Sequence, residues 1–455
     1  MIHNDVLGTI GNTPLVRLNR STPGLRCMVV AKLEAFNPGG SVKDRTAARI
    51  VAEAERAGRL KPGGTIVEST SGNMGVGLAL IAAVKGYRCV VVTTDKQSED
   101  KINLVRAFGA EVRICPTAVE PEDPRSFYSV AKKIAAETPG GFYANQFHSP
   151  DNPAAHYATT GPEIWEGTEG KVHAVVGGLG TGGTLCGAGR FLKEKNAAIQ
   201  IVGVDPFGSL FYDWFHHKTM VKAQMYKIEG IGEDILPGAL DFSVLDDVVQ
   251  VQDKESFLAA RRLAREEGIL AGTSAGAALC GAWKACKSLP KGALVVVIIP
   301  ERGERALGKI YNDEWMRRNQ FLADAGELTA ADLVARKSGE HGALVSLPPN
   351  ARIGEAIRIM QEMDVSQIPI ISDGQVVGNL REDQIIDLLL HAPLRQDAPI
   401  EEIMEDPVPE VAGDSAADEI QRMFVDGRSA VLVRLSGGRR GILTKYDLIH
   451  GLARR

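Results

Sequence analysis

A lysine stands in the first turn of a predicted helix, directly after a glycine-rich loop. The stretch "NPGGSVKDR", residues 37–45, places Lys43 behind two glycines and a serine, and the pattern that follows predicts a helix over residues 45–57. A helix N-terminus carries partial positive charge, so a lysine there slightly destabilises the helix. We therefore expect Lys43 to have a chemical partner.

Three further loops bring hydroxyl groups and glycines to the starts of predicted helices. "ESTSGNMG", residues 68–75, offers hydroxyls and free backbone N–H groups to an anion. "GGLGTGGT", residues 177–184, has the composition of a phosphate cradle, because its glycines let the backbone close on a ligand and its threonines add donors. It matches neither the P-loop nor the Rossmann fingerprint. "GTSAGAA", residues 272–278, places Ser274 near a helix N-cap.

Each loop alone is weak support for a site, because glycine-rich turns occur throughout α/β proteins and a lone lysine is usually solvated. Their combination favours one kind of ligand. A phosphate cradle, a second anion site, an isolated lysine and a lone hydroxyl suit a phosphorylated aromatic aldehyde that bonds to lysine, as pyridoxal phosphate does. Lys43 is then both the covalent anchor and the candidate base.

The elements that must position these loops alternate between strands and helices up to about residue 318. Near-continuous apolar runs predict buried strands at residues 27–33, 64–69, 88–94, 110–115, 173–178, 199–205 and 293–300. Strands of this kind separated by helices indicate open parallel sheets with helices on both faces. Ligands of such folds sit at the carboxyl ends of the strands, where the glycine-rich loops fall.

Composition limits the remaining possibilities. A chain of 455 residues is too long for one core, so we expect two or three domains. The net charge of −5 does not favour nucleic-acid binding, and no apolar run has the length of a membrane span. The N-terminus does not read as a signal peptide. Six scattered cysteines without a C-x-x-C pair argue against a zinc site or a disulfide framework, and indicate reduced thiols in the cytoplasm.

The C-terminal part contains an internal repeat. Residues around Ile370, Gly378 and Leu380 align at one constant offset with Val433, Gly441 and Leu443. Each copy predicts a helix, a strand, a turn, a strand and a helix. A unit of this size needs its twin to bury its apolar face, so the two copies form one module.

Taken in order, the four loops resemble those of the β-family (fold type II) pyridoxal-phosphate enzymes, and the repeat resembles a pair of CBS motifs, a Bateman module. The resemblance implies an α/β catalytic region of two open parallel-sheet subdomains, followed by a tandem CBS-motif module. The implied parts are a catalytic domain at 1–318, a connector at 319–340 and CBS motifs at 341–395 and 396–455. This architecture resembles the cystathionine β-synthase branch, and since the chain lacks that branch's haem-binding extension, no haem is expected.

The resemblance also implies residue roles. Lys43 matches the Schiff-base lysine, Asn73 the residue that bonds the cofactor's ring oxygen, and Ser274 the residue that faces the pyridine nitrogen. The phosphate loop comprises Gly180, Thr181, Gly182, Gly183 and Thr184. The substrate positions comprise Ser69, Thr70, Ser71, Gly72, Met74, Gln146, Gly230 and Glu233. Met74 departs from the family pattern, in which threonine is usual, so one hydroxyl is lost there.

The implied reaction is a β-replacement that condenses L-serine with L-homocysteine to L-cystathionine and water. The alternative is a cysteine synthase that uses O-acetylserine and sulfide, which "TTGPEIWEG", residues 159–167, resembles. "NPAAHYATT", residues 152–160, and "EGIGEDILPGALD", residues 229–241, look more like the cystathionine-forming branch. There Glu233 offers a carboxylate to a co-substrate that bears a cation. A decayed sensor protein is disfavoured, because Lys43 and the phosphate loop are intact.

In CBS pairs, a Gly-x-Ile/Val-Thr/Ser-x-x-Asp stretch binds adenosine. The second copy retains it in "GILTKYD", with Thr444 and Asp447, whereas the first copy has Arg381 and Gln384 instead. The resemblance thus implies at most one adenosyl site, with S-adenosylmethionine as a candidate ligand. Pairing with another copy, as a dimer or tetramer, is the competing role of the module. The histidines, His156 among them, suggest no role.

Overall fold

The computed structural model describes residues 2–22, 25–70, 72–95, 97, 99–120, 122–322, 328–337, 344–391 and 393–453. The chain divides into two compact units between Asn312 and Asp313. The sequence prediction ended the catalytic region at residue 318, whereas helix α11 (Asp313–Arg318) groups with the second unit. In the described part of the chain, no helix combines the length and the apolar character that crossing a membrane requires.

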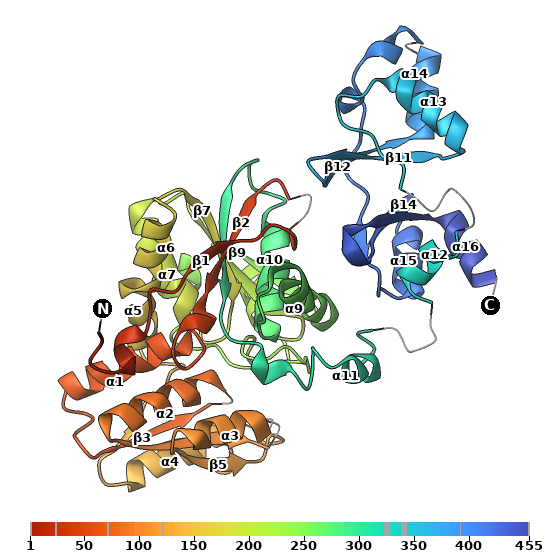
Figure 1. The fold of residues 1–455 in the computed structure, drawn as a ribbon. Coiled ribbons are helices and arrows are strands. Elements are labelled where there is room, and N and C mark those ends of the chain that lie inside the picture. The colour runs from red at the N-terminus through yellow and green to blue at the C-terminus, as the bar shows by residue number, and fades with distance from the viewer. Residues whose placement is uncertain are drawn as a thin grey trace. The chain divides into compact units, whose positions relative to one another are not determined.

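The larger sheet of the first unit has six strands in the order β1-β2-β10-β7-β8-β9 (Figure 1). Its strands are β1 (Leu15–Arg17), β2 (Met28–Leu33), β7 (Val172–Gly178), β8 (Gln200–Pro206), β9 (Asp247–Val251) and β10 (Leu294–Ile299). The predicted parallel pairing is confirmed from β2 to β9. β1 pairs antiparallel with β2. Its three residues are too few to show a hydrophobic pattern, so the sequence does not reveal it.

Helices cover both faces of this sheet (Figure 1). On one face, α6 (Thr160–Gly167) and α7 (Gly183–Lys195) share a core cluster with Val175 of β7. On the other face, Gly281 of α10 (Thr273–Ala285) lies against Val176 and Val204. This double covering explains the near-continuous apolar strands. The remaining helices of this lobe are α5 (Asp151–Ala158), α8 (Phe211–His217) and α9 (Asp253–Glu267).

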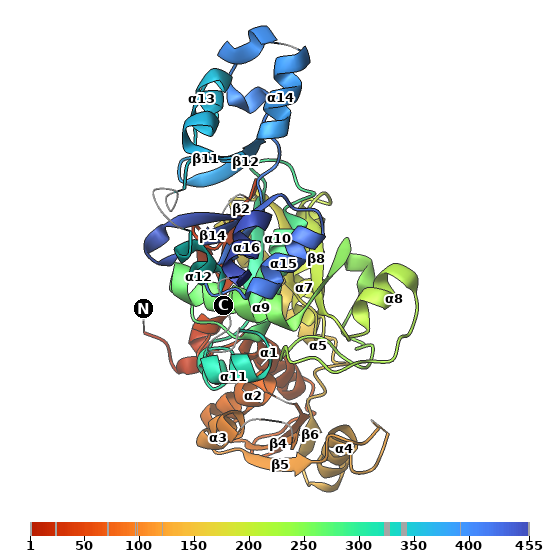
Figure 2. The same ribbon diagram turned by 90° about the vertical axis from the view of Figure 1, so that its right-hand side faces the viewer.

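The smaller sheet is wholly parallel, in the order β5-β4-β3-β6 (Figure 2). Its strands are β3 (Thr65–Ser69), β4 (Arg88–Thr94), β5 (Glu111–Cys115) and β6 (Gly141–Tyr143). Ile66 and Val91 enter a core shared with α1 (Lys43–Arg56), α2 (Asn73–Lys85) and α3 (Glu99–Ala107). Val67 and Val90 enter a second core, shared with α4 (Phe127–Glu137). Two sheets therefore build two lobes, as the family resemblance implies.

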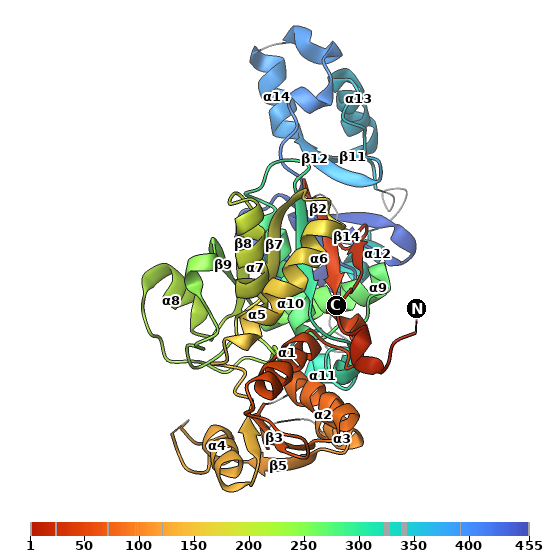
Figure 3. The ribbon, with the colours of Figure 1, turned by 90° about the vertical axis from the view of Figure 1, so that its left-hand side faces the viewer.

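The second unit contains the predicted repeat. In the first copy, β11 (Gln367–Ser372) pairs antiparallel with β12 (Gln375–Arg381), and Ile370 is opposite Gly378. In the second copy, β14 (Ala430–Arg434) pairs with β15 (Arg440–Thr444), and Val433 is opposite Gly441. The same register in both hairpins confirms the repeat. The other elements are α13 (Ile353–Met363) and α14 (Glu382–His391), shown together in Figure 3, and β13 (Glu410–Ala412), α15 (Ala417–Val425) and α16 (Lys445–Ala453).

The segment before the first repeat contributes to the second one. Helix α12 (Ala330–Ala335) places Leu333 in the same buried cluster as Ile420, Val431 and Leu443. Part of the predicted connector, residues 319–340, is therefore a packed element of the second copy. The predicted start of the first CBS motif, residue 341, lies outside the described residues.

Candidate active site

The predicted loops meet in one cavity, at the carboxyl ends of β7 and β10. Eight of the predicted site residues line it: Lys43, Asn73, Gly180, Thr181, Gly182, Thr184, Gly230 and Ser274. These residues come from five separate stretches of the chain, and the parallel strand ends bring them together.

Lys43 is the first residue of α1 and is half-buried. Burial lowers the pKa of its ammonium group, and the carboxylates of Glu233 and Glu301 oppose that shift. Among the contacts of the described residues, no hydrogen bond or ion pair engages its Nζ atom. An amine with a lowered pKa and no competing partner is a good nucleophile and a good base.

Close packing requires glycine at two positions of the turn between β7 and α7. A Cβ at Gly180 would lie 3.0 Å from the carbonyl oxygen of Gly230, and one at Gly182 would lie 2.5 Å from Leu240. Gly182 also has a φ of 78°, which side-chain-bearing residues rarely adopt. The first N–H groups of α7 have no partner within the helix, and a helix start of this kind suits the phosphate of pyridoxal phosphate.

A carboxylate that sequence reasoning missed joins Asn73 and Ser274. The Asn73 amide donates to Glu301 Oε2 over 2.7 Å, and Ser274 Oγ lies 3.5 Å from Glu301 Oε1. Arg305 donates to the oxygen of the same Asn73 amide. Glu301 follows directly after the β10–Pro300 end of a buried strand, and that position is the signal that could have identified it.

The predicted substrate loop lies at the end of β3, and only parts of it reach the cavity. Ser69 and Thr70 are buried, and the Ser69 hydroxyl lies 2.8 Å from the Tyr143 hydroxyl. Gly72 is the N-cap of α2, and its N–H donates to Thr70 Oγ1. Ser71 lies outside the described residues.

Two other predicted substrate residues are buried. The Met74 side chain is 1% exposed and packs in the core between α1 and α2, so a substrate contact there is left to its backbone N–H. Gln146 accepts a hydrogen bond from Asn152 at its backbone oxygen, and its N–H donates to Glu68. The side-chain oxygen of Gln146 has no hydrogen-bond partner among the described residues.

Glu233 places a carboxyl group within electrostatic reach of Lys43. Burial, with the charges of Asp234 and Asp205, raises the pKa of the Glu233 carboxyl to about 8, against the opposing effect of Lys43. The backbone N–H of Glu233 donates to Ser209 Oγ over 3.0 Å, which holds the loop in place. This side of the site therefore carries a carboxyl group that a cationic ligand would ionise.

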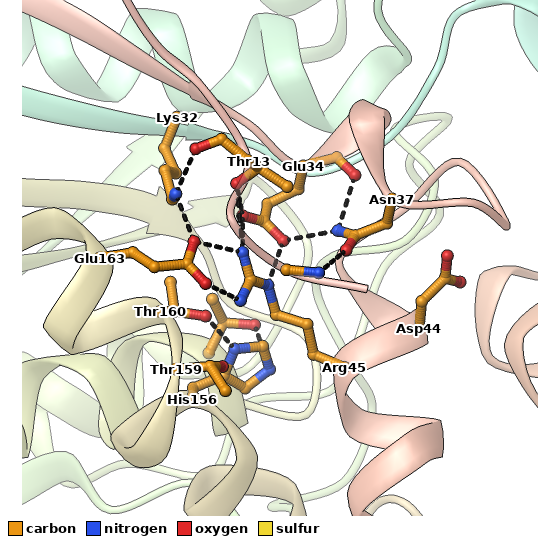
Figure 4. A network of polar contacts seen from close by, with 12 residues as sticks. Thr13, Lys32, Glu34, Asn37, Asp44, Arg45, His156, Thr159, Thr160 and Glu163 are labelled. Carbon is orange, nitrogen blue, oxygen red and sulfur yellow. Dashed lines mark hydrogen bonds and ion pairs between the residues drawn. The ribbon is translucent and has the colours of Figure 1, made fainter. Parts of the chain in front are cut away.

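A buried ion network lies behind the first turn of α1 (Figure 4). Arg45 donates to Glu34 over 2.7 Å and to Glu163 over 2.6 Å, and Lys32 donates to Glu163 over 2.6 Å. Burial alone would raise the pKa of Glu163, but Arg45 and Lys32 bring it down to about 2. The network ties β2 and α6 to the helix that carries Lys43, and sequence reasoning missed it.

The adenosyl motif of the second unit is already internally bonded. Asp447 Oδ2 accepts hydrogen bonds from the backbone N–H and the hydroxyl of Thr444, over 2.7 and 2.8 Å. Lys337 Nζ lies 2.9 Å from the same oxygen. In the first copy, the Gln384 amide oxygen accepts from the backbone N–H of Arg381 instead.

Comparison with known proteins gives separate family matches for the two units of the chain. Residues 6–301 match the family model described as "Pyridoxal-phosphate dependent enzyme", and residues 341–391 match the CBS domain. Cystathionine beta-synthase of Dictyostelium discoideum is 37% identical over 99% of this chain and 92% of its own length. The enzyme of that name from Rattus norvegicus is 40% identical over 86% of this chain and 70% of its own length.

Among solved structures, O-ureido-L-serine synthase is 37% identical, with a TM-score of 0.63. It covers 70% of this chain, and this chain covers all of it. The match thus extends over a length comparable to the first unit, while the cystathionine beta-synthases match over most of the chain. The chain therefore belongs to the pyridoxal-phosphate-dependent enzyme family, among the members that resemble the cystathionine beta-synthases.

Proposed function

We propose that this chain condenses L-serine with L-homocysteine to L-cystathionine and water, with pyridoxal phosphate as cofactor. The observation that carries the proposal is that Lys43, which lines the cavity, lies close enough to the Glu233 carboxyl group for each to shift the pKa of the other. A base and a cation-binding carboxyl group are the two elements that this reaction needs beyond the cofactor. Cystathionine beta-synthases that match over most of the chain support the assignment.

Bound pyridoxal phosphate supplies an aldehyde that takes up the substrate amine and withdraws electrons from its Cα. Lys43 is then the base that removes the Cα proton of serine, because its lowered pKa keeps a larger share of the amine neutral. The β-hydroxyl leaves as water with the proton of the homocysteine thiol, the sulfur bonds to Cβ, and Lys43 returns its proton to Cα. The glycine-rich turn before α7 holds the phosphate, and Asn73 and Ser274 orient the ring. Ser69, Thr70 and Gln146 are the proposed partners of the serine carboxylate.

Contacts between the two lobes would keep water out of the reacting cavity. Glu229, next to Gly230 of the cavity wall, forms ion pairs with Lys101 of α3 and with Lys309. These pairs connect the lobe of the smaller sheet to the loop that carries Glu233. Exclusion of water matters here, because water would compete with the thiol for the activated substrate.

Glu233 is the proposed group that distinguishes homocysteine from sulfide. Homocysteine carries an ammonium group that a carboxylate can bind, whereas sulfide carries none. A product assay tests this assignment. The cofactor-loaded protein is incubated with L-serine and L-homocysteine, or with O-acetylserine and sulfide, and products are identified by mass. Cystathionine as the dominant product is expected, and cysteine as the dominant product would reject the proposal.

We predict that Glu233→Gln lowers kcat/KM for homocysteine about tenfold, which is the loss expected for one charge-assisted hydrogen bond. Because the pKa of Glu233 lies at about 8, its negative charge develops as the pH rises through that value. The ratio of wild-type to variant kcat/KM should therefore grow between about pH 7 and pH 9. Ionisation of the thiol affects both proteins equally and cancels in the ratio. A ratio that stays constant would exclude a charge role for Glu233.

We propose one adenosyl site in the second unit, around Thr444 and Asp447. Asp447 is the proposed partner of the ribose hydroxyls, and Lys337 now neutralises it. A ligand must therefore displace Lys337 or share the carboxylate with it.

Calorimetric titration of the full chain with S-adenosylmethionine and with AMP tests this site. We expect one equivalent of ligand to bind to the wild type and no binding to Asp447→Asn, while Gln384→Ala in the first copy leaves binding unchanged. Absence of heat with either ligand on the wild type would remove the sensor function.

Homo-oligomerisation, as a dimer or tetramer, is also part of the proposal. Its support is a set of exposed apolar side chains on the helices of the second unit: Ile386, Leu390, Val425, Tyr446 and Ile449. A cytoplasmic location is supported by the cysteines, all six of which are free thiols.

A further inference from the structure

Helix α5 carries two polar side chains, one turn apart, that are completely buried. Asn152 and His156 are both 0% exposed and lie on the same helix face. Buried polar groups of this kind are retained where their hydrogen bonds are satisfied. Their partners are residues of the candidate active site, to which neither was assigned from the sequence.

His156 lies between the helix of Lys43 and the phosphate loop. Its Nε2 atom is 3.2 Å from the hydroxyl of Thr46, on α1, and 3.3 Å from the hydroxyl of Thr184, which lines the cavity. Its Nδ1 atom is 2.8 Å from the hydroxyl of Thr160, and Figure 4 shows this contact beside Arg45.

Asn152 makes a parallel connection. Its amide nitrogen donates to Thr181 Oγ1 and to the backbone oxygen of Gln146, both over 2.9 Å. Its amide oxygen accepts from Thr46 Oγ1 over 3.2 Å. Because the Gln146 oxygen can only accept, the nitrogen of the Asn152 amide must face it, and the orientation of the amide is determined.

These contacts assign the hydroxyl protons. Thr46 gives its single proton to Asn152, so it can only accept from His156, and Nε2 of His156 must carry a hydrogen. Burial lowers the pKa of His156 well below its usual value, and the positive charges of Arg45 and Lys43 lower it further. The ring is therefore neutral, and Nδ1 accepts the proton of Thr160.

Among the contacts of the described residues, the hydroxyl protons of Thr181 and Thr184 have no acceptor, and both residues line the cavity. Thr184 and Thr46 share the single Nε2–H of His156 as acceptors, and Thr181 accepts from the amide of Asn152. Each threonine keeps its own hydroxyl proton, and both line the cavity. Both are thus prepared to donate to an anion rather than to another protein group.

Close packing holds this arrangement rigid. A Cβ at Gly183 would lie 2.0 Å from Asn152 Oδ1, and one at Gly187 would lie 2.0 Å from the backbone oxygen of Pro153. The N-terminal turns of α7 can therefore approach α5 only with glycine at these positions.

We propose that Asn152 and His156 are positioning residues that hold Thr181 and Thr184 as hydrogen-bond donors to the cofactor phosphate. Both also contact Thr46 of α1, so they fix the phosphate loop relative to the helix that carries Lys43. This inference rests on the proposed site, because it takes the turn before α7 as the phosphate cradle. A merely structural role predicts equal losses for ligands with and without a phosphate.

The test compares pyridoxal phosphate with pyridoxal, which lacks the phosphate. Cofactor-free full-length protein is titrated with each compound, and binding is followed by the visible absorbance of the bound ring. His156→Leu is expected to weaken pyridoxal phosphate about tenfold, since the hydrogen bonds at stake end on a charged group, and to change pyridoxal less than about twofold. Equal losses for both compounds, or no loss for either, would overturn the proposal.

His156→Gln tests the same point in a variant that keeps a donor. Its amide N–H can replace that of Nε2, so its preference for pyridoxal phosphate should stay within about threefold of the wild type. A loss as large as that of His156→Leu would contradict the donor role. If His156→Leu does not fold, Thr184→Val is compared with the double variant Thr184→Val/His156→Gln. The double variant should bind pyridoxal phosphate as well as Thr184→Val alone does. A further loss of affinity would count against the positioning role of His156.

The outcomes separate the two levels of inference. If the wild type binds both compounds equally, the phosphate cradle and the positioning role of Asn152 and His156 are both rejected. If the wild type prefers pyridoxal phosphate over pyridoxal and His156→Leu keeps that preference, only the positioning role is rejected and the proposed function stands.

Discussion

Lys43→Ala should lower the turnover of L-serine and L-homocysteine by about 10³-fold or more, because it removes both the covalent anchor and the proton-transferring base. The fold should be preserved, since no contact of the described residues engages the Lys43 ammonium. Burial disfavours the charged form of this amine, so its removal should maintain or raise the thermal midpoint of the cofactor-free protein. Turnover and the midpoint are measured on the same preparation.

Lys61→Ala provides the matched control, because Lys61 is exposed and lies in the same lobe as α1. It should leave turnover and the thermal midpoint unchanged. Retention of more than about a tenth of the wild-type turnover by Lys43→Ala would assign the base to another residue, since the loss of a positioned base costs at least about 10²-fold.

Glu163→Gln should lower the free energy of unfolding by about 3 kcal/mol, which is typical when one partner of a buried ion network is neutralised. Arg45 and Lys32 have side chains that are only 1% exposed, and both would lose a carboxylate that now lies 2.6 Å away. Urea unfolding followed by tryptophan fluorescence reports mainly on the first unit, which holds three of the four tryptophans, Trp165, Trp214 and Trp283, while Trp315 belongs to the second unit.

The effect should depend on pH in a defined direction. Glu163 has a pKa of about 2 in the folded chain, against an ordinary value of 4.5. Its stabilising contribution is thus fully present above pH 4.5 and is lost as the pH falls from 4.5 towards 2. The difference between wild type and Glu163→Gln should shrink over this range. Glu169→Gln, which neutralises an exposed partner of Lys171, should leave the urea midpoint unchanged at every pH.

Two of the loops at the candidate cofactor site could be predicted from the sequence for the same reason. "GGLGTGGT" and "GTSAGAA" each follow or open a regular element, and their glycine and hydroxyl content is itself the binding chemistry. Parallel strands place their carboxyl ends along one edge, so the meeting of Lys43, Thr181 and Ser274 in one cavity follows from the strand pattern alone.

Other parts of the site depend on contacts between residues far apart in the chain. Glu301 became part of the site because the end of β10 lies beside Asn73, more than two hundred positions away. Met74 shows the converse: its position in the loop suggested a substrate contact, but helix packing turns its side chain into the core. No local pattern specifies which side a helix residue presents to a distant neighbour.

By itself, the sequence determined the parallel α/β character of the catalytic region, the repeated module and the lysine around which the chemistry is built, while its division into two lobes was implied by the family resemblance. These features are written in short patterns: apolar runs, glycine-rich turns and a constant repeat offset. Only the tertiary structure decided which buried polar groups support the site. Arg45 of α1 pairs with Glu163 of α6, and His156 of α5 contacts Thr184 of α7. Such pairs arise because whole helices pack together, as α5 does with α1 and α7, and not because the residues are neighbours in sequence.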